Sequence, residues 1–190
     1  MKQSTSYSVI QRAMHWLMAL SIFGLFGLGF WMVDLTYYSE WYRTAPYWHQ
    51  SIGVLLAVCW LVRLVIIRIQ GKPKPLISHS KFEIKAAHAV HTVLYLLMFC
   101  LFISGYLIST ADGRAIAVFN WFEIPGLGEL FAEQSARAGL VHEYSAYALI
   151  AFAALHALGA LKHHFIDKDD TLNRMLGRTL PQQPSNTQEH

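Results

Sequence analysis

Two histidines, His142 and His156, lie 14 positions apart in one long apolar stretch of the sequence. At roughly 100° per residue, 14 steps return to nearly the same face of a helix. At about 1.5 Å per residue, they separate the two imidazoles by about 21 Å along the helix axis. Because a neutral imidazole is a metal ligand, one face of a single helix offers a metal ligand at two depths.

In each of the other three apolar stretches, a spacing of 14 residues connects a histidine with a glycine or an arginine. It leads from His15 to Gly29, from His49 to Arg63, and from His91 to Gly105. A buried planar cofactor needs such features, because imidazoles ligate it, small residues make room for it and a cation meets its acidic edge. Two alternatives stay open: the glycines also suit ordinary helix packing, and Arg63 also suits a side chain that snorkels to the membrane interface.

Haem b is the cofactor that fits four histidines at two depths. Two neutral imidazoles fill both axial positions of one iron, which favours electron transfer over oxygen chemistry. His49 and His142 each lie near the outer end of an apolar stretch, so they are predicted to pair at an outer level. His15 and His156 lie near the inner ends of their stretches, so they are predicted to pair at an inner level. Arg63 falls at the inner level, where we expect it to meet haem propionates.

His91 also enters its apolar stretch from the inner side, so it is an alternative to His15 as an inner ligand. His88 precedes it by three residues, and side chains three apart can face one neighbour. Both are candidates for a quinone site, for propionate binding, or for the membrane interface. His163 is expected to pack at the interface, and His79 lies in a polar segment where a solvated side chain is expected.

The composition indicates an integral membrane protein. Of the 190 residues, 54% are hydrophobic and 14% are charged, against roughly 25% charged in a typical soluble domain. No CxxCH pattern exists, which argues against covalently attached haem. No nucleic-acid partner is expected. Four stretches are long enough to span the bilayer, at about 13–33, 48–67, 89–109 and 140–161.

Because helices satisfy the backbone within lipid, the predicted fold class is all-α. We expect residues 1–180 to form one domain, an up-down four-helix bundle. The third connection is the longest, and its amphipathic stretch 127–137 predicts a short extra helix at the outer mouth. Residues 181–190 are predicted to be a disordered tail.

Lysine and arginine are distributed unequally between the two ends of the predicted bundle. Twelve lie on the side of the two termini and three on the other, which predicts that both termini are cytoplasmic. The outer side also carries seven acidic residues. Its average field therefore repels an anion, and attraction would need a local patch formed by Arg43, Arg114 or Arg137.

The sequence resembles the bacterial cytochrome b561 family of di-haem membrane proteins. This family is related to the cytochrome b subunits of nickel–iron hydrogenases. The resemblance covers residues 8–178. It rests on RAMHW from Arg12, WHQSIG from Trp48, KAAHAVH from Lys85, HEYSAYALIAFAALHALGALKHHF from His142, and DDTLNRML from Asp169. It implies a bacterial inner-membrane location, the same two histidine pairs for haem b, and quinone as a redox partner.

The sequence therefore predicts electron transfer through two haem b groups between the periplasmic face and the quinone pool. The family resemblance adds superoxide oxidation coupled to quinone reduction, with ubiquinone as a further bound molecule, which would make the chain an oxidoreductase. A second hypothesis is a haem-containing membrane anchor and electron conduit for a separate redox enzyme, which would co-purify with it. A third is a histidine-lined metal transporter, which would lack haem absorbance.

Overall fold

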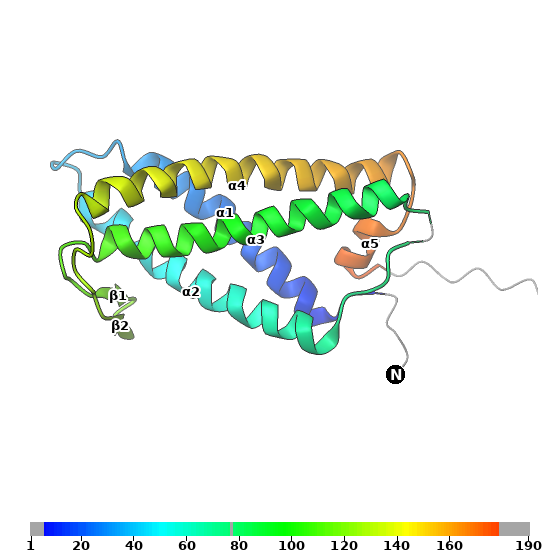
Figure 1. The fold of residues 1–190 in the computed structure, drawn as a ribbon, viewed down its shortest axis with the longest axis horizontal. Helices are drawn as coiled ribbons and strands as arrows, with labels where there is room; N and C mark the ends of the chain where they lie inside the picture. Colours follow the sequence, from blue (N-terminus) through cyan, green and yellow to red (C-terminus); the bar gives the residue numbers. More distant parts are fainter. Residues whose placement is uncertain (1–5, 77, 179–190) are drawn as a thin grey trace, which may run out of the picture.

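The structure is a computed structural model that describes residues 6–76 and 78–178. Figure 1 shows an elongated bundle in which long helices run between two ends. All four of these helices are long and apolar enough to cross a membrane. The predicted membrane four-helix bundle is confirmed. The helices are α1 (Val9–Met32), α2 (Trp41–Gln70), α3 (Lys81–Ser109) and α4 (Gln134–Phe165).

The helices extend beyond their apolar stretches, because polar residues fix their ends. At the start of α1, the Ser8 hydroxyl accepts from the Gln11 backbone N–H, and the Gln11 side chain accepts from the Ser8 backbone in return. Ser80 and Glu83 form the same reciprocal cap on α3. Gly71 ends α2 with a positive φ of 74°, which a side chain would disfavour.

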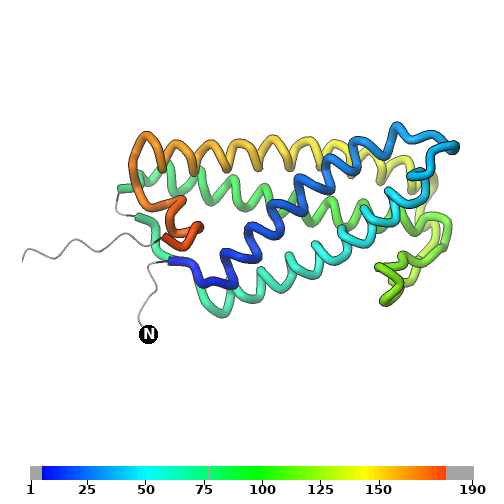
Figure 2. The backbone as a smooth tube through the Cα atoms, turned by 180° about the vertical axis from the view of Figure 1, so that it is seen from behind, coloured from blue at the N-terminus to red at the C-terminus, as the bar shows by residue number. Residues whose placement is uncertain are grey.

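The four helices form two closely packed pairs, α1 with α2 and α3 with α4, and contacts between the pairs are fewer. Figure 2 shows α1 from behind, running obliquely across the bundle. Each helix contributes one side chain to a buried apolar layer, made of Met18, Leu56, Met98 and Leu149. Leu56 and Leu149 each lie seven residues beyond an outer-level histidine, so the layer lies about halfway between the two histidine levels.

The third connection contains a β-hairpin rather than the short helix predicted over 127–137. Strand β1 (Ile116–Val118) pairs antiparallel with β2 (Phe122–Ile124). Alternate residues of β1 are buried, and Ser51 of α2 donates a hydrogen bond to the Ala117 carbonyl at 3.3 Å. The period-2 burial of β1 and its contact with α2 favour a strand.

The helix predicted over 127–137 was wrong, because one glycine lies within this range and another directly before it. Gly128 has a φ of 73°, and a Cβ at Gly126 would overlap the backbone carbonyls of Gly113 and Arg114. The apolar residues that suggested a helix face are exposed. Within the predicted range 127–137, only residues 134–137 are helical, and they form the first turn of α4.

Beyond α4, a short helix α5 (Thr171–Leu176) folds back under the bundle. The Trp16 indole donates to the Met175 carbonyl at 3.2 Å, and Arg174 donates to the Lys74 carbonyl at 2.8 Å. These bonds join the C-terminal segment to α1 and to the connection between α2 and α3. The predicted tail 181–190 lies outside the described residues.

Gln134 is a fully buried polar side chain that fastens the outer connection to the bundle. Its amide donates to the Leu107 carbonyl at 2.9 Å and the Gly128 carbonyl at 3.3 Å. Its oxygen accepts from the Leu130 backbone N–H at 2.7 Å. One side chain thus satisfies backbone groups of α3 and of the loop that precedes α4.

We predict that Gln134→Ala lowers the free energy of unfolding by about 1–3 kcal/mol, because it leaves buried backbone groups unpaired. Thermal unfolding in detergent measures the change. Ser135→Ala is the matched control, since Ser135 is the exposed neighbour. Equal stability of the two variants would contradict the role assigned to Gln134.

Candidate functional site

At the outer level, α2 and α4 place two imidazoles opposite each other. The ring centroids of His49 and His142 are 6.1 Å apart, with an angle of 64° between the ring planes. Each ring lies against a glycine of a neighbouring helix: a Cβ at Gly29 would be 3.1 Å from His49, and one at Gly105 would be 3.2 Å from His142. These glycines, which the sequence pattern singled out, make room for the imidazoles.

Ser104 orients the His142 ring. The Ser104 hydroxyl lies 2.7 Å from the Cys100 carbonyl and donates to it. Its oxygen also lies 3.1 Å from His142 Nδ1 and is left to accept the Nδ1–H. In that tautomer the lone pair of Nε2 is available to a metal, and the hydrogen bond at the other nitrogen fixes the ring.

His49 Nδ1 is buried and has no hydrogen-bond partner among the described residues. A buried polar atom left unpaired costs roughly 1–3 kcal/mol. No hydrogen bond from this atom ties the His49 ring to a neighbouring helix, and the other ring nitrogen, Nε2, is the one that suits a group lying between the helices.

At the inner level, the ring centroids of His15 on α1 and His156 on α4 are 6.2 Å apart, with an angle of 72° between their planes. His91 on α3 is closer to His156, with centroids 4.9 Å apart. The structure therefore gathers all three inner candidates around one point. The separation of His15 from His156 matches that of the outer pair, whereas His91 packs directly against the His156 ring.

Arg63 of α2 lies beside this inner cluster, close enough to all three inner histidines to act on them electrostatically. Its Nη1 donates to the Gln11 carbonyl at 2.8 Å. Just outside α1, burial raises the pKa of the Tyr7 phenol, although Arg63 and Arg174 oppose that rise. Tyr7 is thus a neutral hydroxyl at the inner mouth.

The spacing of the paired imidazoles would suit the iron of a haem held between them. A metal–nitrogen bond of about 2 Å on each side, together with the two ring radii, accounts for centroids 6.1 and 6.2 Å apart. Each pair joins the α1–α2 half of the bundle to α4, across the region where contacts between the halves are few. Together with the unpaired His49 nitrogen and the two glycine contacts, this donor set suits a planar group held between the halves.

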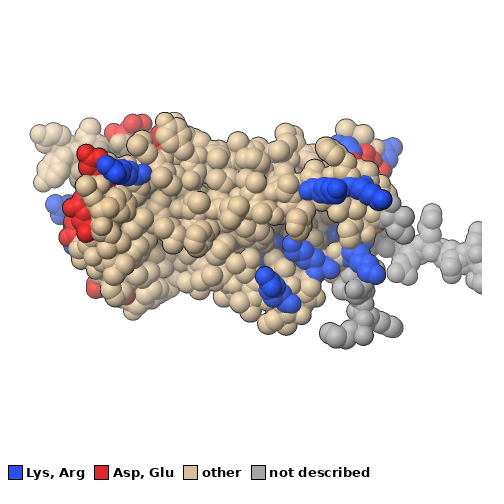
Figure 3. All heavy atoms as spheres, viewed as in Figure 1, with Lys and Arg blue, Asp and Glu red and all other residues tan. Residues whose placement is uncertain are grey.

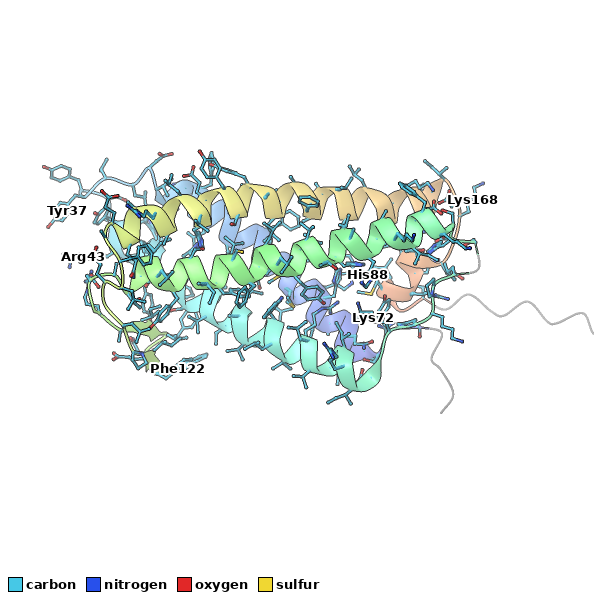
Figure 4. The ribbon with its side chains drawn as sticks, in the orientation of Figure 1. Tyr37, Arg43, Lys72, His88, Phe122 and Lys168 are labelled. Atoms are coloured by element: carbon cyan, nitrogen blue, oxygen red, sulfur yellow. The ribbon has the colours of Figure 1, made fainter. Side chains whose placement is uncertain are left out.

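The charges lie at the two ends of the molecule. Figure 3 shows lysine and arginine gathered at the α5 end, carboxylates near the hairpin, and a largely uncharged middle. Figure 4 places Tyr37, Arg43 and Phe122 at the hairpin end and Lys168 at the other end. The uncharged middle is the part that a bilayer core would surround.

Two of the three outer arginines are already paired with carboxylates. Arg114 binds Asp112, with its Nη2 2.5 Å from Oδ2, and this hydrogen bonding holds the pKa of the Asp112 carboxyl below its ordinary value. Arg137 faces Glu133 at 3.5 Å. Arg43 has no ion-pair partner among the residues that the structure describes. Of the three arginines that could form the local positive patch an anion would need, Arg43 is therefore the one left without an ion-pair partner among the described residues.

Sequence reasoning missed a polar cluster at the inner end. His79 was expected to be solvated, but its Nε2 lies 2.9 Å from Asp169 Oδ2 and its side chain is 16% exposed. His163 was expected to pack at the interface, but it contacts the same oxygen at 3.2 Å. Burial acts to raise the pKa of the Asp169 carboxyl, yet hydrogen bonds from Thr171 and His79 lower it overall. No short-range pattern could have joined these residues, because His79 lies far from the other two in the sequence.

Comparison with known proteins agrees with this geometry. The family model described as prokaryotic cytochrome b561 matches residues 6–178. Cytochrome b561 homolog 2 of Escherichia coli (strain K12) is 49% identical over 173 residues, which cover 91% of this chain and 92% of that protein. The probable superoxide oxidase CybB of Yersinia pestis is 32% identical over 181 residues, or 90% of this chain and 95% of that protein.

The match extends over nearly all of the described chain, including all four spans and α5. The chain is therefore a multi-pass bacterial membrane protein of the kind that transfers electrons through haem b. This conclusion rests on the four membrane helices, on the histidines paired between them and on the family match. It belongs to the prokaryotic cytochrome b561 family.

Proposed function

We propose that the chain transfers electrons between the outer face of the membrane and quinone, through two haem b groups at the two histidine levels. His49 and His142 are the residues that would hold the outer haem, and His15 and His156 those that would hold the inner one. The main support for this proposal is that both histidine pairs bridge the two halves of the bundle with nearly equal distances between ring centroids, 6.1 and 6.2 Å. Haem b, when bound, supplies a one-electron couple.

The surrounding residues serve this role in distinct ways. Ser104 is the hydrogen-bond partner of His142 Nδ1, and Gly29 and Gly105 give the outer rings their space. Arg63 contributes positive charge at the inner level, where its remaining N–H groups suit propionate oxygens. His91 is assigned to packing against His156 rather than to ligation, because its ring is closer than a bridging metal allows.

We further propose that superoxide is the outer electron donor and that membrane quinone, such as ubiquinone, is the acceptor. The similarity to a probable superoxide oxidase supports the donor. The excess of cationic residues at the α5 end supports an orientation with the described N-terminal region and α5 on the cytoplasmic side. The hairpin end, with Arg43, then faces the periplasm.

Single replacements of the four proposed ligands are expected to remove haem in two groups. His49→Ala and His142→Ala should each lose the outer haem, and His15→Ala and His156→Ala the inner one, because the remaining imidazole cannot hold the iron as tightly alone. Pyridine haemochrome quantitation gives the haem content of each purified variant, and redox titration shows which haem remains.

His91→Ala is the matched control for these variants, since it removes an imidazole at the same depth. It should retain both haems. If His91→Ala loses a haem while His15→Ala keeps both, the inner ligand is His91 and the proposed pairing is wrong.

A side chain at either outer glycine should displace the adjacent imidazole. We expect Gly29→Val and Gly105→Val to lose the outer haem and retain the inner one, because even a Cβ lies only 3.1–3.2 Å from each ring. Absorbance spectra and haem quantitation report the loss. Gly27→Val on the same helix is the control, since a Cβ there meets nothing within 4 Å. An unchanged haem content in all three variants would refute the assigned contact.

Arg43→Gln should slow the reduction of the haems by superoxide by about threefold to tenfold and weaken its dependence on salt, because it removes an unpaired cation from an acidic face. Stopped-flow absorbance measures the rate. Arg114→Gln is the control, because Asp112 already neutralises Arg114, and it should have a smaller effect. Equal rates in the wild type and Arg43→Gln would exclude Arg43 from superoxide docking.

A further inference from the structure

A second group of metal-ligating side chains lies at the α5 end, outside the haem sites. His79 immediately precedes the cap of α3, His163 lies in the last turn of α4, and Asp169 lies between α4 and α5. One ligand atom from each of the three lies within 4.8 Å of the others. Figure 1 shows that the start of α3, the end of α4 and α5 meet at this end of the bundle.

We propose that His79, His163 and Asp169 form a binding site for a divalent transition-metal ion of the zinc type, which fastens the C-terminal segment to the bundle. Two imidazoles and a carboxylate are a donor set that suits zinc. Asp167 adds a neighbouring carboxylate, since its Oδ2 lies 2.8 Å from His163 Nδ1, and it converges with His163 and Glu83 rather than with all three proposed ligands.

The distances agree with ligands that converge on one ion. Ligand atoms about 2 Å from a tetrahedral ion lie about 3.3 Å from each other. The Asp169 Oδ2 lies 2.9 Å from His79 Nε2 and 3.2 Å from His163 Nδ1. His163 Nδ1 is nevertheless buried without a hydrogen-bond partner among the described residues. Its carboxylate neighbours are close, but they do not satisfy it by hydrogen bonding.

The supporting contacts orient the ligands. The Asp169 Oδ1 accepts the Thr171 backbone N–H at 2.8 Å, which leaves Oδ2 for the two imidazoles. The Asp169 backbone N–H in turn donates to the His163 carbonyl at 3.0 Å. A ligand whose second atom is held by the protein is the usual arrangement around a bound metal.

The local charge also favours a dication. Three carboxylates gather around the imidazoles, from Glu83, Asp167 and Asp169, and Lys162 is the cation bound among them. With neutral histidines the formal charge of this group is −2. A divalent ion neutralises it, and neutral imidazole is the form that ligates.

Metal analysis of the haem-loaded protein tests the proposal. The full chain, purified through an affinity tag without histidine, is incubated with zinc and freed of unbound ion, and zinc and iron are then measured by mass spectrometry. The wild type should retain about one zinc per chain. His79→Ala and Asp169→Asn should lose it, with zinc affinity reduced by more than about tenfold. Asp169→Asn keeps an oxygen for the Thr171 N–H, so the start of α5 is preserved.

His164→Ala is the matched control, because it removes the adjacent imidazole, whose ring makes an edge-to-face contact with Phe165, and it should retain zinc. An unchanged iron content in every variant shows that each is folded; where His79→Ala loses iron, His79→Gln replaces it. Zinc X-ray absorption on the wild type should show imidazole in the first shell. A wild type without zinc, or equal zinc in all variants, would overturn the proposal.

Discussion

An imidazole inside a membrane bundle needs a partner, because the hydrocarbon around it offers none. The whole molecule is arranged around that requirement. Two closely packed helix pairs have few contacts with each other, and both imidazole pairs lie across the division between them. In the proposed function, the group held between the imidazoles also joins the two halves. In the proposed function, cofactor binding and assembly of the bundle are the same event, so the stability of the fold depends on cofactor supply.

The outer and inner levels meet this requirement differently. The outer imidazoles are surrounded closely, by glycines that leave little spare space and by Ser104, which hydrogen-bonds to His142. The inner level is more polar, with a third imidazole and a guanidinium nearby. A positive charge near a redox group favours its reduced form. In the proposed function, the two levels therefore give the same ligand set different electrochemical surroundings, and the positive charge at the inner level favours electron transfer towards it.

Much of this could be predicted from the sequence, because helix periodicity and bilayer thickness act on every residue of a span. A spacing of 14 residues was enough to place His142 and His156 at two depths. The hairpin could not be predicted in this way, since the burial of β1 depends on its contact with Ser51 of α2. The cluster of His79, His163 and Asp169 could not be predicted for the same reason, because it too depends on contacts between distant segments. These residues meet because the start of α3 lies beside the end of α4, where the chain turns towards α5, and no local pattern encodes a contact across that distance.

The apolar layer of Met18, Leu56, Met98 and Leu149 has a consequence for energetics. It separates the two histidine levels with side chains that carry no exchangeable proton. In the proposed function an electron therefore crosses this layer alone, without a proton to balance its charge. Since the levels are about 21 Å apart, that step moves charge across most of the hydrocarbon core. Its free energy then includes the membrane voltage, at about 2.3 kcal/mol per elementary charge for a full crossing of 100 mV. The same protein would thus run faster or slower as the cell's membrane is charged or discharged.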